Sequence, residues 1–281
     1  MAHAVRKAMS QIQYGCQTYP WKMNIEKFAG DMPHIVATTA AAGFAGLEAE
    51  ICMLGDYFDR PDDFAALLRQ HGIQFAALVL HQPWEHREET EDESALTKKA
   101  IAFVSRFPRA KLMVSHHAKA ERGEGDVLAA KRDCLIRCMS SVADRAAEAG
   151  VVTCFHPNSG RFSLFRTAED YKVLFEMLEK TDIGYAPDIG HIVNGGMDAL
   201  AVLRASRSKI RHVHFKDRIA QNEWAVMGEG TIDYPAIIRY LADTEYGGWI
   251  MVEDESPKAA ADSDAVVLAD GAYIAAQKQK G

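Results

Sequence analysis

The chain has 281 residues, a length that fits one large domain or two ordinary ones, and single α/β barrels of about 250 residues are common. Hydrophobic residues make up 48% of the chain and charged residues 25%, which is typical of a globular protein with a sizeable core. The formal net charge of −7, without a basic stripe, argues against a nucleic-acid-binding surface, so we expect no nucleic-acid partner.

The five cysteines indicate reduced thiols rather than disulfides or a zinc site. They lack paired zinc-type spacing, and Cys134 and Cys138 lie four residues apart on an expected helix. Residues 1–10 contain no apolar core of signal-peptide length, and no run reaches the roughly 18 apolar residues of a membrane helix. We therefore expect a cytoplasmic protein that does not enter a membrane.

Short apolar runs bounded by turn residues predict eight strands. They are residues 12–18, 46–51, 74–82, 110–117, 151–158, 183–191, 210–217 and 249–255. We expect residues 18–24 to form a loop, because Pro20 interrupts continuation of the first strand.

The segments between the strands have helical periodicity, and several end at a glycine. Helices are expected at about residues 25–42, 62–71, 93–107, 127–149, 167–180, 198–205, 234–243 and 262–277. Pro33 lies near the start of the first helix or at a break in it. Thr167 and Asp170 resemble a capping box, with aspartate in place of the usual glutamate or glutamine.

Eight strands that alternate with eight helices predict parallel βα units, and their number favours a single (β/α)8 TIM barrel. We place residues 1–281 in one domain, with a short N-terminal extension at about residues 1–11. A doubly wound open sheet is the alternative. That fold normally has a glycine-rich phosphate-binding turn after its first strand, and GCQTYPW is no such turn.

Residues 210–217, IRHVHFKD, have an unusual pattern for a buried parallel strand. Because side chains alternate along a strand, His212, His214 and Lys216 share one face. Buried parallel strands usually carry aliphatic residues there. The polar face therefore predicts a chemical role.

Three other expected strands also carry one ligand-type side chain near the carboxyl end, which is the catalytic rim of a barrel. Two imidazoles and two carboxylates suit Mn²⁺, Co²⁺, Fe²⁺, Zn²⁺ or Mg²⁺. The candidate metal site is His156, Asp188, His214 and Glu253. For each of them the alternative is a polar side chain satisfied by loop backbone, and a one-residue shift of the last strand would present Asp254 instead of Glu253.

His191 and Lys216 are candidates for contacts with substrate. His191 follows Asp188 by three residues, and it could bind the metal, donate a hydrogen bond to a substrate hydroxyl, or belong to a turn cap. Lys216 could hold a substrate oxyanion or carbonyl. A salt bridge from Lys216 to Glu229 or Asp217 is the alternative.

Glu48 and Glu50 share a face of their expected strand, and a buried pair of carboxylates suggests an acid–base or hydroxyl-binding role. Glu50 could instead be exposed at the strand end.

His81 and His116 end the third and fourth strands and would add hydrogen-bonding groups to the same rim. Aromatic side chains in rim loops could stack on a sugar face, with core packing as the alternative. They are Trp21, Trp84, Phe162 and Trp224.

Several runs, in order and over nearly the whole chain, resemble the xylose isomerase-like TIM barrels. They are GFAGLEAE, HPNSG, PDIGHIVNGG, RHVHFKD, MGEGTIDY and GGWIMVEDES. That group includes sugar-phosphate isomerases and epimerases, ketose 3-epimerases, hydroxypyruvate isomerase and inosose dehydratase, and HPNSG and DIGHIVNGG look closest to the inosose dehydratase branch. The resemblance implies a divalent metal, Mn²⁺ or Co²⁺ first, with Mg²⁺, Zn²⁺ or Fe²⁺ as alternatives. It also implies His156, Asp188, His214 and Glu253 as the four ligands, and His191 near the substrate.

The first ligand position departs from one branch of this family. Ketose 3-epimerases carry a glutamate there, and their two glutamates exchange protons on opposite faces of the substrate carbon. Here the position is His156, and an imidazole held on the metal is a poor second base, so a lyase fits better than a symmetric epimerase.

The expected substrate is a small keto-sugar or keto-cyclitol, and the expected chemistry is metal-assisted removal of the proton beside its carbonyl to give an enediolate. Glu253 or Glu48 would take that proton, and His191, His81 or Lys216 would assist departure of a β-hydroxyl or return a proton. The reaction would be that of an inosose dehydratase-like or 3-keto-glycoside lyase. A sugar isomerase or ketose 3-epimerase is the alternative from the same family.

Two further function classes are weaker. A phosphodiester hydrolase related to endonuclease IV would need more metal ligands, and the negative charge disfavours DNA binding. A non-catalytic sugar-binding barrel would tolerate loss of His214 without loss of ligand binding. The resemblance also implies association of two or four copies into a homo-oligomer.

Overall fold

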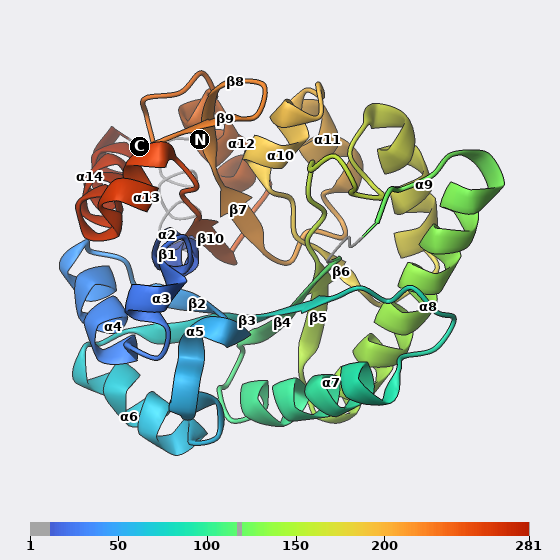
Figure 1. Cartoon of the computed structure of the whole chain (residues 1–281). Coiled ribbons are helices and arrows are strands. Elements are labelled where there is room, and N and C mark those ends of the chain that lie inside the picture. Colours follow the sequence, from blue (N-terminus) through green and yellow to red (C-terminus); the bar gives the residue numbers. More distant parts are fainter. Residues whose placement is uncertain (1–11, 117–119, 281) are drawn as a thin grey trace. The chain divides into compact units, whose positions relative to one another are not determined.

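The computed structural model describes residues 12–116 and 120–280, so the expected extension at about residues 1–11 lies outside the described residues. The chain, drawn in Figure 1, divides by its internal contacts into two compact units. Unit 1 combines residues 12–76 with residues 212–280, and unit 2 runs from residue 77 to 211. Among the described residues no helix is long and apolar enough to cross a membrane.

Parallel strands form the sheet of unit 1. They are β1 (Gln13–Gln17), β2 (Gly46–Glu50), β7 (Val213–Phe215) and β10 (Trp249–Val252). The strands pair in the order β2, β1, β10, β7, and Met251 of β10 lies opposite both Gly15 and His214. A Cβ atom on Gly46 would lie 2.5 Å from the ring of Trp249, so only glycine lets this indole pack against the sheet.

Unit 2 contains the next parallel strands in chain order. They are β3 (Gln74–Gln82, which starts in unit 1), β4 (Lys111–His116), β5 (Val152–Phe155) and β6 (Gly184–Tyr185). One face of these strands carries a buried apolar cluster of Ala77, Val79, Met113, Cys154 and Ala186. All eight predicted parallel strands are therefore present in the described part of the chain.

Helices follow the strands throughout. Those of unit 1 are α2 (Tyr19–Lys22), α3 (Ile25–Phe28), α4 (Met32–Ala41), α5 (Ile51–Leu54), α6 (Pro61–Gln70), α12 (Tyr234–Asp243), α13 (Pro257–Ala261) and α14 (Ser263–Lys280). Those of unit 2 are α7 (Glu91–Val104), α8 (Gly125–Glu148), α9 (Ala168–Leu178), α10 (Ile189–Asn194) and α11 (Ala199–Ser206). A 3₁₀ turn, η1, covers Gly55–Phe58.

Three predicted element boundaries are wrong. Residues 18–24 contain α2 rather than a loop, because proline is tolerated in the first turn of a helix, where Pro20 lies. The single helix expected at residues 25–42 is divided, since Gly30 adopts a positive φ of 81° and Asp31 caps a new helix. The sixth strand ends early because Asp188 caps α10.

The MGEGTIDY segment is a tightly held loop beside a hairpin that the sequence did not predict. The hairpin consists of β8 (Asp217–Ala220) and β9 (Glu223–Ala225), which pair antiparallel (Figure 1). The carboxylate of Asp217 accepts hydrogen bonds from the backbone N–H groups of Arg218, Gly228 and Gly230 at 2.9–3.1 Å. These bonds fix the loop on the hairpin, so its glycines serve close packing.

We predict that Gly230→Ala destabilises the protein by about 1–3 kcal/mol, as overpacking of a tight site does. The added Cβ would lie 2.1 Å from the Oδ1 atom of Asp217, within a backbone cradle that has little room to move. Urea unfolding followed by circular dichroism measures the change. Gly160→Ala is the control, because its nearest neighbour would be 3.5 Å away. Equal midpoints for the two variants would contradict this account.

The predicted capping box at the start of α9 is confirmed. Asp170 accepts hydrogen bonds from the backbone N–H groups of Arg166 and Thr167, both at 3.0 Å, and its own N–H bonds to the Thr167 hydroxyl. The carboxylate also forms ion pairs with the buried Arg132 and the half-buried Arg122. Burial would raise the pKa of Asp170, but the hydrogen bonds and the positive charge hold it well below the usual range.

We predict that Asp170→Asn costs about 3–5 kcal/mol at pH 7, because it leaves the buried guanidinium of Arg132 and the half-buried one of Arg122 without their carboxylate. Since the folded-state pKa lies below the unfolded one, this stabilisation is present above about pH 4 and is lost as the pH falls through the folded pKa. Urea unfolding at pH 7 and pH 3 should therefore show a gap between wild type and variant that narrows in acid. The control is Asp133→Asn, which removes an exposed pair with Arg137 and should change little.

Candidate metal centre

His214 is the centre of a buried polar cluster in unit 1. Its Nδ1 lies 2.7 Å from Oε2 of Glu253, and its Nε2 lies 3.1 Å from Oε2 of Glu48. That same glutamate oxygen is 2.7 Å from Nε2 of His212. All four side chains are at most 4% exposed, so this is a desolvated carboxylate–imidazole network.

The charges in this network stabilise one another. Burial would lower the pKa of His214, but the charge of Glu48 and the hydrogen bonds that the ring donates to both carboxylates raise it to about 10. Burial would raise the pKa of Glu48, but the charge of His214 and hydrogen bonds from both histidines lower it to about 2. Glu48 is thus an ionised carboxylate enclosed by two imidazole rings.

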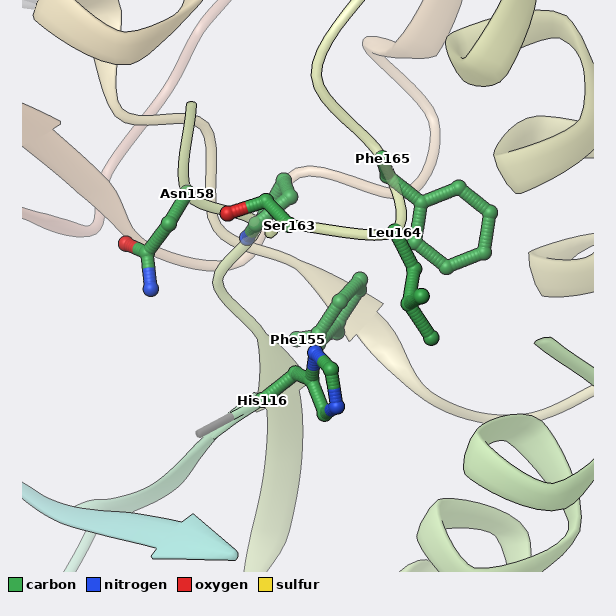
Figure 2. Close-up of a pocket in the computed structure, with 7 residues that line it drawn as sticks. His116, Phe155, Asn158, Ser163, Leu164 and Phe165 are labelled. Carbon is green, nitrogen blue, oxygen red and sulfur yellow. The ribbon is translucent and has the colours of Figure 1, made fainter. Parts of the chain in front are cut away.

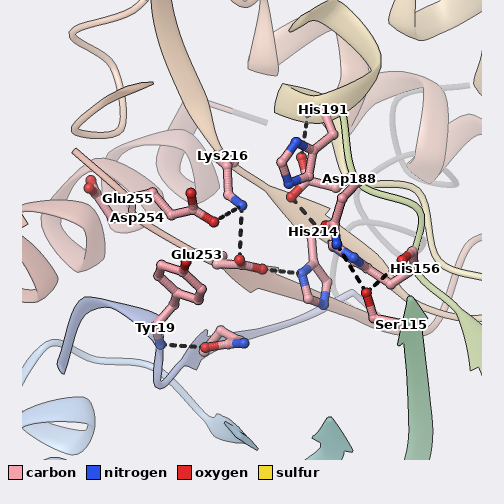
Figure 3. Close-up of polar contacts among 12 residues, drawn as sticks. Tyr19, Ser115, His156, Asp188, His191, His214, Lys216, Glu253, Asp254 and Glu255 are labelled. Carbon is pink, nitrogen blue, oxygen red and sulfur yellow. Dashed lines mark hydrogen bonds and ion pairs between the residues drawn. The ribbon is translucent and has the colours of Figure 1, made fainter. Parts of the chain in front are cut away.

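Lys216 is fully buried beside the same glutamate. Figure 3 shows its ammonium between two carboxylates, with Nζ 2.8 Å from Oε1 of Glu253 and 2.6 Å from Oε1 of Glu255. The rings of Tyr19 and Trp224 lie 5.7 and 5.3 Å from Nζ, which is within reach of a cation–π interaction.

The partners considered for Lys216 in the sequence have other contacts. Glu229 pairs with Lys258 at 2.7 Å, and Asp217 accepts backbone N–H groups. The ammonium of Lys216 contacts Glu253 and Glu255 instead.

The strand register presents Glu253 and not Asp254 to His214. Asp254 instead accepts the backbone N–H of Ser256 at 2.6 Å, and burial raises its pKa to about 6. The alternative of an exposed Glu50 is wrong, because Glu50 is 3% exposed and pairs with Lys22 at 3.0 Å.

Unit 2 carries the other two predicted ligands at the carboxyl ends of β5 and β6. Strand register aligns His81 with Ser115, and the N–H of His156 bonds to the carbonyl of Val114, so His81, Ser115 and His156 form a row on one face. The Ser115 hydroxyl donates to the carbonyl of His156 at 3.1 Å. Nε2 of His156 lies 3.5 Å from Oδ2 of Asp188.

His191 is held in a defined orientation within unit 2. The backbone N–H of Ser159 donates to Nδ1 of His191 at 3.3 Å, and the Ser159 hydroxyl lies 2.8 Å from the same nitrogen. Asn194 donates to that hydroxyl at 2.8 Å, which leaves the hydroxyl proton for the imidazole. Because Nδ1 accepts, the ring carries its proton on Nε2. Asp188 receives the N–H of His191 on Oδ1, so the turn-cap interpretation also holds.

Two predicted substrate-contacting residues lie elsewhere. His116 follows Ser115 on β4 and faces the opposite side of the strand, where it lines a small pocket with Phe155, Leu164 and Phe165 (Figure 2). Trp21 is completely buried, and its indole N–H donates to Asp264 at 2.7 Å. Core packing accounts for Trp21.

Sequence reasoning missed the residues that orient the candidates. Ser115, Ser159 and Glu255 each contact one of them, through a backbone carbonyl, an imidazole and an ammonium respectively. The sequence could have indicated Glu255, because it continues the alternation from Glu253. It could not have indicated Ser115, because the contacts of Ser115 depend on strand register.

Among the described residues, two groups of buried donors offer ligand atoms close together. Metal–ligand bonds of about 2.0–2.1 Å in a tetrahedral site place ligand atoms about 3.3 Å apart. The 3.5 Å between His156 and Asp188 fits such an edge. Glu48, His212 and His214 also offer ligand atoms within 4.8 Å of one another; Glu48 and His212 lie at a hydrogen-bond distance of 2.7 Å, as His214 and Glu253 do. The mixed imidazole and carboxylate donors at the strand ends therefore fit a divalent metal.

Comparisons with known proteins find similar sequences and similar folds. The chain is 26% identical over 272 residues to an inosose dehydratase of Geobacillus thermodenitrificans (strain NG80-2), covering 85% of this chain and 87% of the relative. The IOLI protein, crystallised with a bound zinc atom, has a similar fold, with a TM-score of 0.75, 15% identity and coverage of 95% and 98%. The 3-keto-D-glucoside 4-epimerase YcjR from E. coli has a TM-score of 0.72, 16% identity and coverage of 95% and 99%.

The predicted α/β TIM-barrel fold is confirmed by these structural neighbours. A family model described as "Xylose isomerase-like TIM barrel" matches residues 36–271, which is most of the chain. The chain belongs to the xylose isomerase-like TIM barrel family.

Proposed function

We propose that this protein is a divalent-metal-dependent lyase that acts on a keto-sugar or keto-cyclitol, as an inosose dehydratase or a 3-keto-glycoside lyase does. The observation that carries the proposal is the buried contact of Glu253 with His214 on one oxygen and with Lys216 on the other. This arrangement combines a proton-accepting carboxylate with a fixed positive charge. The inosose dehydratase similarity over most of the chain supports the same reaction class.

The proposed metal ligands are the four that the sequence predicted, His156, Asp188, His214 and Glu253. Their positions after β5, β6, β7 and β10 support this choice, because the active sites of TIM barrels lie at the carboxyl ends of the strands. Mn²⁺ and Co²⁺ are the first candidates, and Mg²⁺, Zn²⁺ and Fe²⁺ also suit the donors. A bound divalent ion would polarise the substrate carbonyl and so acidify the neighbouring C–H bond.

Three side chains then have separate roles in the proton transfers. Glu253 accepts the proton from the carbon beside the carbonyl. Lys216, positively charged between Glu253 and Glu255, stabilises the negative charge that develops on substrate oxygen. His191 donates a hydrogen bond from Nε2–H to a substrate hydroxyl, since Nδ1 is occupied by Ser159.

In the elimination, the C–H bond beside the carbonyl and the C–O bond at the β-carbon both break, and a C=C bond forms. The proton passes to Glu253, and the departing hydroxyl takes a proton from Lys216 or His191 and leaves as water. With a glycoside the departing group is the alcohol of the aglycone instead. No oxidant or reductant is needed.

Product analysis tests the proposal. Protein loaded with Mn²⁺ or Co²⁺ is incubated with inososes, 3-keto-glycosides and common ketoses, and the products are identified by NMR and mass spectrometry, with a chelated sample as control. We expect metal-dependent loss of water or of the aglycone. Formation of an epimer or isomer without loss of mass would establish the isomerase alternative, and binding without turnover would indicate a non-catalytic sugar-binding barrel.

We also predict a homo-oligomer of two or four copies, a cytoplasmic location and a single domain. Size-exclusion chromatography with light scattering measures the assembly directly. A monomer over the whole concentration range would contradict the first of them.

A further inference from the structure

Glu48 contacts the nitrogen of His214 that does not face Glu253. Its carboxylate lies 3.0–3.1 Å from Nε2 of His214, whereas Glu253 lies 2.7 Å from Nδ1. His212 approaches the same Glu48 oxygen at 2.7 Å, and its ring centroid is 5.5 Å from that of His214. The Glu48 side chain is completely buried, so both imidazoles bind a carboxylate that water does not reach.

This contact pattern does not suit Glu48 to the role of a base. A general base must come within hydrogen-bond distance of the substrate proton, and Glu48 is 0% exposed with its Oε2 shared by two rings. Of the two glutamates weighed as bases from the sequence, Glu253 alone keeps that role.

A carboxylate on the far nitrogen of a histidine is the arrangement that orients histidine ligands in metal sites. It fixes the ring and its tautomer and raises the basicity of the coordinating nitrogen. In His214 this leaves Nδ1, the nitrogen beside Glu253, as the coordinating atom.

We propose that Glu48 and His212 are positioning residues that hold the Nε2–H of His214 and thereby direct its Nδ1 toward the metal. This inference rests on the proposed metal centre. His212 acts through Glu48: its Nε2–H binds the glutamate oxygen and keeps the carboxylate against His214.

Glu50 provides an internal comparison. It lies two residues along β2, is equally buried, and is also paired, but with Lys22 at 3.0 Å and Gln17 at 3.4 Å. If burial and pairing alone mattered, Glu48 and Glu50 would behave alike. If the contact with His214 matters, only Glu48 affects metal binding.

The test is a titration of the metal-free protein with Co²⁺, followed by its visible absorption, which reports ligand geometry without any turnover. Loss of a carboxylate that hydrogen-bonds a metal-binding histidine lowers the metal affinity by about 10–100-fold. We expect Glu48→Gln to raise the Kd for Co²⁺ by that factor and to shift the spectrum. Glu50→Gln should leave both unchanged, whatever it does to the unfolding midpoint.

Substitutions at His212 give a second, milder series. His212→Leu removes the N–H that binds Glu48, and it should weaken Co²⁺ binding; His212→Gln keeps a donor and should restore much of the affinity. Long-range ¹H–¹⁵N spectra of the metal-free protein add a readout that is independent of the metal, since the Nε2 signal of His214 should change in Glu48→Gln. Unchanged Kd, spectrum and Nε2 signal in the folded Glu48 and His212 variants would overturn the inference.

Failure of the metal centre itself has a different signature. In that case the wild-type protein would bind no Co²⁺ although the Nε2 signal still responded to Glu48→Gln. That result would overturn the proposed function together with the metal-directing role inferred for Glu48.

Discussion

Lys216→Met is expected to lower kcat for elimination by about 10²–10⁴-fold, the usual contribution of a positioned proton donor. Methionine fills a similar volume but removes the charge that contacts Glu253 and Glu255. The buried Glu253 and the half-buried Glu255 then lose this cation, so the free energy of unfolding should fall by about 3–5 kcal/mol. Steady-state kinetics and urea unfolding measure the two effects.

Two variants separate activity from stability. The double variant with Lys216→Met and Glu255→Gln lacks one of the two carboxylates that repel each other. It should recover stability without recovering kcat. Lys258→Met breaks an exposed pair with Glu229 and should change neither quantity. A folded Lys216→Met protein with wild-type kcat would exclude Lys216 from the reaction.

Glu253→Gln should have a comparable effect on kcat, about 10²–10⁴-fold, because it removes the carboxylate that accepts the proton. It should also weaken metal binding, since a neutral amide replaces a charged ligand. Co²⁺ titration and the rate of elimination at saturating metal distinguish the two losses.

Asp254→Asn is the matched control one residue along the same segment. Burial raises the pKa of Asp254 to about 6, so a neutral side chain costs little there, and Oδ1 of asparagine can still accept the N–H of Ser256. We expect kcat to stay near the wild-type value. Loss of activity in Asp254→Asn with retention in Glu253→Gln would mean that the wrong carboxylate has been assigned.

The sequence predicted elements best where both ends carry strong local signals. The strand at residues 74–82 and the helix at residues 234–243 match β3 and α12 at both ends, the latter because Asp233 caps the helix and Pro235 lies in its first turn. Elsewhere a proline alone did not tell a loop or a break from the start of a helix. Pro20 and Pro33 lie in the first turns of α2 and α4.

Alternation along a strand is local, so it placed His214 and Lys216 on one face of their strand; that both contact Glu253 is seen only in the structure. The contact of Glu48 with His212 joins residues 164 positions apart and depends on packing in the folded unit. No single-sequence pattern predicts it.

Register between strands was equally inaccessible. His81 and His116 both end strands, but β3 and β4 pair His81 with Ser115, and this one-residue offset turns His116 to the other face. Sequence reasoning therefore identified residues near strand ends better than the direction in which their side chains point.

Deuterium exchange tests the central claim, metal-dependent proton removal beside a carbonyl, most directly. Protein loaded with Mn²⁺ or Co²⁺ is incubated in D₂O with inososes, 3-keto-glycosides and ketoses, and proton NMR follows the carbon next to the carbonyl; a chelated sample is the control. We predict deuterium uptake there together with loss of the β-substituent, and neither in the chelated sample. Equal exchange with and without metal, or none on any substrate, would contradict the account.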